Sequence, residues 1–113
     1  MNAKELDEYE DHLVERMVEF GVDHHAAAVS AYVMEGTPFG GFLTALFENN
    51  LMRAMSEADD TNKPLMGAWC KFIYNACPSG TWGSPKAVRQ WRDQGGLKGS
   101  IALQVSEAMK GAG

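Results

Sequence analysis

Residues 4–20 read KELDEYEDHLVERMVEF and place an apolar stripe and an acidic stripe on opposite sides of one predicted helix. At about 100° per residue, one narrow face collects Leu6, Tyr9, Leu13, Met17 and Phe20. This spacing is typical of an amphipathic helix that packs its apolar side on a core. The pattern of this segment therefore predicts a helical fold, and the function of its charged face is a separate question.

Four carboxylates follow the opposite side of this helix, at Glu8, Asp11, Glu15 and Glu19. They are three or four residues apart, so each like-charge pair costs about 0.2–0.5 kcal/mol in an isolated helix. Folding alone does not require that arrangement. Two interpretations stay open: a solvated face that keeps the protein in solution, or a recognition surface for a basic partner.

The length of 113 residues, with 45% hydrophobic and 22% charged residues, is typical of one globular domain. No apolar run is long enough to span a bilayer, and no signal-peptide pattern opens the sequence. We therefore expect a cytoplasmic protein without a membrane partner. The charge is uneven, because residues 1–52 hold ten acidic residues against Lys4 and Arg16.

Capping signals divide the chain into short helices. Gly21 ends the first helix, Asp23 can cap a second that stops near Gly36, and Thr37-Pro38 begins a third that continues to Met55. Pro64 opens a fourth helix, which ends near residue 76.

The clearest helix start is Ser84-Pro85, which predicts a helix to Gln94 that Gly95-Gly96 ends. A last helix is expected over residues 100–109. Strand-like alternation is absent from the sequence, so the predicted fold class is all-α: a compact single domain of five or six short helices over residues 1–109, with a frayed tail at 110–113.

Candidate catalytic and metal-binding residues are few. His24 and His25 would point about 100° apart on a helix, without another ligand at a suitable spacing. Asp59 and Asp60 lack the glycine and glutamate of a calcium loop, so they are interpreted as a helix cap. We expect no enzymatic activity, no metal and no cofactor.

The two cysteines give no catalytic signal either. Cys70 stands between Trp69 and Phe72 and is predicted to be a small buried core residue. Cys77 precedes Pro78 and is expected to be the more exposed of the two. Nothing near either residue marks an activated thiol.

A second charged region contains Lys86, Arg89 and Arg92 at three-residue spacing, beside Trp82 and Trp91. Basic and aromatic residues together can bind nucleic acid through phosphates and stacking. The structural interpretation pairs Arg89 with Asp93 and assigns the tryptophans to the core or a loop. Nucleic-acid binding is therefore kept as the alternative function.

The segment from Phe39 to Trp91 carries a distinctive set of glycine, asparagine and aromatic positions. They are Gly40-Gly41-Phe42-Leu43, Asn49-Asn50-Leu51, Ala58-Asp59, Asn62, Leu65, Tyr74-Asn75, Pro78, Trp82-Gly83-Ser84 and Trp91. This spacing resembles that of small uncharacterised helical proteins encoded by phages and prophages. It covers about half of the chain and consists mainly of core, cap and turn residues, so the resemblance implies a shared fold more than a shared site.

The resemblance also implies a small accessory protein that blocks host machinery, such as an anti-CRISPR or other anti-defence protein. The carboxylates from Glu8 to Glu19 would span about 16 Å, a row comparable to phosphates along a strand. The leading expectation is a mimic of nucleic acid that inhibits a host protein or protein–nucleic acid complex. A third interpretation is a homo-oligomer.

Overall fold

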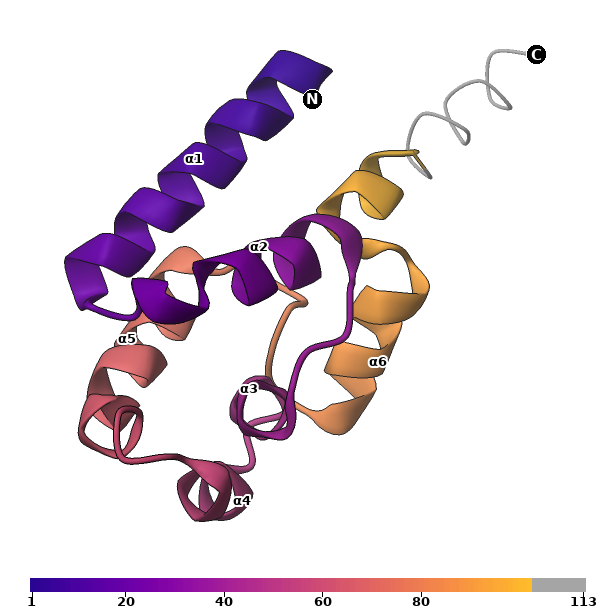
Figure 1. Cartoon of the computed structure of the whole chain (residues 1–113). Helices are drawn as coiled ribbons and strands as arrows, with labels where there is room; N and C mark the ends of the chain where they lie inside the picture. Colours follow the sequence, from indigo (N-terminus) through magenta and orange to yellow (C-terminus); the bar gives the residue numbers. More distant parts are fainter. Residues whose placement is uncertain (103–113) are drawn as a thin grey trace.

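The computed structural model describes residues 1–102, and every regular element in that range is helical (Figure 1). The α-helices are α1 (Ala3–Phe20), α2 (Ala26–Glu35), α3 (Gly41–Phe47), α4 (Leu51–Glu57), α5 (Met66–Ala76) and α6 (Pro85–Asp93). Short 3-10 helices, η1 (Asp23–His25) and η2 (Lys63–Leu65), precede α2 and α5, and residues 96–102 form a further helical segment. The all-α class is confirmed, with seven α-helical segments in place of five or six. The predicted boundary at residue 109 and the tail at 110–113 lie outside the described residues.

The additional helix arises because the predicted third helix is two helices, α3 and α4. Asn49 adopts a left-handed backbone conformation with φ of 62°, which interrupts the helical path. The Asn50 side chain then caps α4 by accepting a hydrogen bond from the Arg53 backbone N at 3.1 Å. Asparagine tolerates the left-handed region and caps helices well, so Asn49-Asn50 is a turn. The start of the third helix was also wrong, because α3 begins at Gly41 and not at Thr37-Pro38.

Several other helix ends agree with the capping signals in the sequence, but two predicted starts do not: Asp23 lies within η1 and does not cap α2, and Pro64 lies in η2, ahead of α5. Gly21 and Gly36 end α1 and α2 with φ of 76° and 75°. Ser84 caps α6, since its Oγ accepts a hydrogen bond from the Ala87 backbone N at 3.0 Å. Asp59 Oδ1 accepts from the Asn62 backbone N at 2.8 Å and so closes the turn before η2, but Asp59 and Asp60 do not cap a helix as predicted, because the N-cap position of η2 is Asn62.

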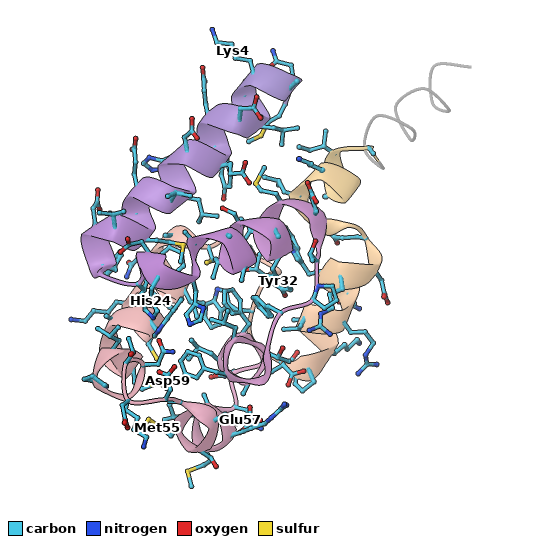
Figure 2. All side chains as sticks on the ribbon, in the orientation of Figure 1. Lys4, His24, Tyr32, Met55, Glu57 and Asp59 are labelled. Atoms are coloured by element: carbon cyan, nitrogen blue, oxygen red, sulfur yellow. The ribbon has the colours of Figure 1, made fainter. Side chains whose placement is uncertain are left out.

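One hydrophobic core connects all of these helices. The first helix, α1, packs against α2 and α5, and α3 pairs with α4 (Figure 1). Leu13 and Met17 are the buried residues of α1. Tyr32 projects from α2 into the interior (Figure 2). The packed side of α1 therefore fixes the direction of its opposite side, which faces away from the core.

Buried hydrogen bonds attach the segment after α5 to the rest of the fold. The Tyr32 hydroxyl donates to the Thr81 carbonyl oxygen at 2.7 Å. Trp91 Nε1 donates to the carbonyl oxygens of Tyr32 at 3.0 Å and Val33 at 3.2 Å. Trp91 is thus a core residue that holds α6 against α2.

A second buried polar cluster joins η1, η2 and α5 around the Asn62 side chain, which is only 3% exposed. Asn62 Oδ1 accepts from Trp69 Nε1 at 3.0 Å and lies 2.8 Å from His24 Nε2. The amide nitrogen, Nδ2, lies 3.4 Å from His25 Nε2. One amide therefore meets polar groups from two segments, η1 and α5, at the edge of the core.

This cluster predicts a large loss of stability for Asn62→Leu, which retains the approximate volume and removes the hydrogen bonds. The buried Trp69 indole N–H would lose its acceptor, which costs about 1–3 kcal/mol in the free energy of unfolding. Urea unfolding measures the change. Asn75→Leu, at an exposed position, is the control and should change stability by less than about 0.5 kcal/mol. Equal effects of the two substitutions would contradict this role of Asn62.

Candidate binding surfaces

The predicted acidic face is present on the outer side of α1. Glu8, Asp11, Glu15 and Glu19 are all exposed, and the side chains of Glu8 and Glu15 retain 65% and 74% of their accessible surface. The helix positions them because Leu13 and Met17 are buried on its other side. Lys4 lies near the free N-terminal end of the same helix (Figure 2).

The net charge of the chain is concentrated on α1. This helix contains seven acidic and two basic residues, whereas the rest of the chain contains eight of each. The formal charge of −5 therefore belongs to α1 alone. A rigid rod with this charge creates a local negative potential that a nearly neutral remainder does not cancel.

Ion pairs on this face are local to the helix. Lys4 Nζ lies 4.0 Å from Glu8 Oε1, His12 Nδ1 lies 3.8 Å from Glu15 Oε2, and Arg16 pairs with Glu19. Within residues 1–102, Asp11 has no ion-pair partner, and no basic side chain from another helix pairs with α1. Exposed pairs of this kind contribute little, so the face stays available to an external cation.

The three predicted basic residues of α6 do not form one surface. Lys86 and Arg89 are exposed, but Arg92 is half-buried, with Nη2 3.4 Å from Thr44 Oγ1. The expected ion pair between Arg89 and Asp93 is absent from the described part of the chain. Arg92 is drawn inward because Trp91 packs into the core beside it and the Arg92 backbone lies against Gly36.

A groove of about 340 Å³ that the sequence did not predict lies between the end of α3, α5 and the loop before α6. Its apolar walls come from Leu46, Ile73, Tyr74 and Trp82, and its polar residues are Asn49, Cys70, Lys71 and Asn75. Lys71, Tyr74 and Asn75 are spaced i, i+3 and i+4, so they share one outer face of α5. This spacing is the sequence signal that could have indicated the groove.

Both cysteine predictions were wrong. Cys70 is exposed at this groove, because the buried face of α5 is made by Met66, Trp69, Phe72 and Ile73. Cys77 packs against the core at the end of α5, where burial raises the pKa of its thiol to about 12.

A smaller hollow of about 230 Å³ lies beside the Asn62 cluster, with His25, Phe42, Glu57 and Asp59 among its walls. Figure 2 shows His24, Glu57 and Asp59 on this side of the molecule. In the described range, no group of three or more His, Cys, Asp and Glu side chains is arranged to hold a metal ion. The His24 and His25 rings lie with centroids 4.6 Å apart and belong to the packing around Trp69.

Comparison with known protein families, curated proteins and solved structures finds no match to this chain. Among the described residues, no helix has the length and apolar character needed to cross a membrane. The surfaces above therefore have to be interpreted from their own chemistry.

The like-charge neighbours on α1 predict that Asp11→Asn stabilises the protein. Asp11 is one helical turn from Asp7, Glu8 and Glu15, so removing its charge relieves three repulsions worth roughly 0.5–1.5 kcal/mol in total. Urea unfolding at low salt measures the gain. Asp60→Asn, at an exposed position outside α1, should change stability by less than about 0.5 kcal/mol. A loss of stability in Asp11→Asn would show that this charge supports the fold.

The pKa of His25 is lowered, mainly by burial and also by the neighbouring charge of His24. The carboxylate of Asp59 raises this pKa and partly offsets the two effects. The unfolded chain then binds a proton more readily than the folded one, so stability is complete above about pH 6.5 and falls as the pH drops below it. Unfolding free energies at pH 7.5 and 5.5 should show a smaller loss in His25→Gln than in the wild type. His12→Gln, on the exposed face of α1, should follow the wild type. The same loss in all three proteins would contradict the assignment to His25.

Proposed function

We propose that this chain is a small phage-type accessory protein that binds a host nucleic-acid-binding complex and blocks it with the acidic face of α1. A CRISPR or other defence effector in the host cytoplasm is the kind of partner that fits. The protein acts by occupying a basic surface and performs no catalysis. The observation that carries this proposal is the confinement of the whole net charge to one helix, whose acidic side is exposed.

The shape of the charged face supports this function. The row from Glu8 to Glu19 spans about 16 Å at 1.5 Å per residue, on a rod about 10 Å wide. Grooves that bind nucleic acid present lysine and arginine side chains to a similar row of phosphates. Because α1 is already ordered on α2 and α5, its binding costs little conformational entropy.

The energetics support it as well. Like charges at helical spacing work against folding, and no cation from another described helix pairs with them. Natural proteins accept such losses mainly where a surface has a function. The alternative, nucleic-acid binding by Lys86, Arg89 and Arg92, loses support because Arg92 contacts Thr44 and is only partly accessible.

The test compares two variants with the same change in net charge. The first combines Glu8→Gln, Asp11→Asn, Glu15→Gln and Glu19→Gln, and the matched control combines Asp23→Asn, Glu35→Gln, Asp60→Asn and Asp93→Asn. Immobilised wild-type protein should retain a basic complex from host lysate at low salt and release it at high salt. The first variant should lose this retention, and the control should keep it.

Inhibition is measured on the same complex, as nucleic-acid binding in the presence of increasing amounts of each protein. The wild type and the control should compete with nucleic acid, and the α1 variant should not. Circular dichroism establishes that all three proteins are folded. Equal retention and equal competition by the α1 variant would remove the acidic face from the mechanism.

A further inference from the structure

The groove beside α5 has the construction of a small-ligand site. Its volume of about 340 Å³ is in the usual range for ligand pockets, which combine apolar walls with a few polar groups. Its floor and walls are apolar, from Leu46, Ile73 and two aromatic rings. No residue of α1 lines it, so it is separate from the acidic face.

Two aromatic side chains lie at this groove: Tyr74, which the core does not need, and Trp82, which is half-buried and packs against the core with part of its surface. Tyr74 is 74% exposed, although Trp69 and Phe72 on the same helix are fully buried. The rings of Tyr74 and Trp82 lie with centroids 5.9 Å apart at an interplanar angle of 55°. They form an open, tilted pair, against which a further flat ring can pack edge-to-face or offset.

The charge of the groove indicates the charge of the ligand that it would bind. Lys71 is the single charged residue among those that line it, and within residues 1–102 its ammonium group forms no ion pair. The side-chain amide of Asn49 adds hydrogen-bond donors that suit a carboxylate, whereas Asn75 Nδ2 already donates to the Lys71 carbonyl oxygen at 2.8 Å. An apolar surface with one unpaired cation at its edge is complementary to a ring that carries a negative group.

We propose that this groove binds a small aromatic carboxylate, with its ring against Tyr74 and Trp82 and its carboxylate on Lys71. The ring supplies the apolar contact, and the ion pair with Lys71 fixes its orientation. This inference does not depend on the function of α1, because the two surfaces share no residue.

The test uses indole-3-acetate as the probe and the tryptophan side-chain signals of ¹⁵N-labelled protein as the readout. Trp69 and Trp91 donate their indole N–H groups to buried acceptors, whereas Trp82 lies at the groove. Indole-3-acetate should therefore shift the Trp82 cross-peak, which Trp82→Phe identifies, and leave the other two in place. A ligand of this size should saturate the shift with a Kd of about 1 mM.

Variants and related probes separate the two parts of the site. Lys71→Gln should weaken binding about three- to fivefold, and Tyr74→Ala about three- to tenfold, while Lys86→Gln on α6 should have no effect. Tryptamine, which has the same ring and a positive charge, should bind more weakly than indole-3-acetate. Lys71 and Tyr74 are both exposed, so we expect Lys71→Gln and Tyr74→Ala to leave the fold intact.

Three results would overturn the proposal. The first is an unmoved Trp82 cross-peak at about 10 mM indole-3-acetate, tenfold above the expected Kd. The second is equal affinity for tryptamine, which would exclude recognition of the carboxylate. The third is a Trp82 cross-peak that moves when the protein alone is diluted, which would assign the groove to a contact between copies of the chain.

Discussion

The fold depends on the buried amide of Asn62, which joins segments that are far apart in the sequence. Its oxygen accepts a hydrogen bond from Trp69 on α5 and lies next to His24 in η1, while Asp59 accepts from its backbone N. An unsatisfied polar group in this position would be costly, so the amide selects one arrangement of the three segments. Because η1 connects α1 to α2, this amide ties that connection to α5, while the burial of Leu13 and Met17 determines which side of α1 faces outward.

Local signals in the sequence predicted the helical class and several helix ends, because caps act within three or four residues. Gly21, Gly36 and Ser84 are examples whose roles need no tertiary contact. The break at Asn49 was missed because the apolar pattern continues through it, and a left-handed asparagine costs little to form. Of the candidate residues, the exposed positions on α1 follow from helical periodicity alone. The inward position of Arg92 does not, because it depends on the contact of α6 with Thr44 and Gly36.

The groove, like the inward position of Arg92, depends on tertiary contacts that local sequence signals do not predict. Its residues come from α3, α5 and the loop before α6, so no single periodic pattern contains them. The exposed Tyr74 and Cys70 arise because α5 turns a different face, with Trp69 and Phe72, toward the core. The molecule thus combines a charged face built from one helix with an apolar groove built from three segments. The two surfaces differ in their chemistry, so the two proposed binding functions can be tested separately.

We propose that the carboxylates of α1 contact the partner directly. Carboxyl labelling with a carbodiimide and glycine ethyl ester, read by mass spectrometry on the free protein and on the captured complex, measures this contact residue by residue. The account predicts that complex formation protects Glu8, Asp11, Glu15 and Glu19, while Asp23, Asp60 and Asp93 stay as reactive as in the free protein. Equal labelling of the α1 carboxylates in both states would contradict it.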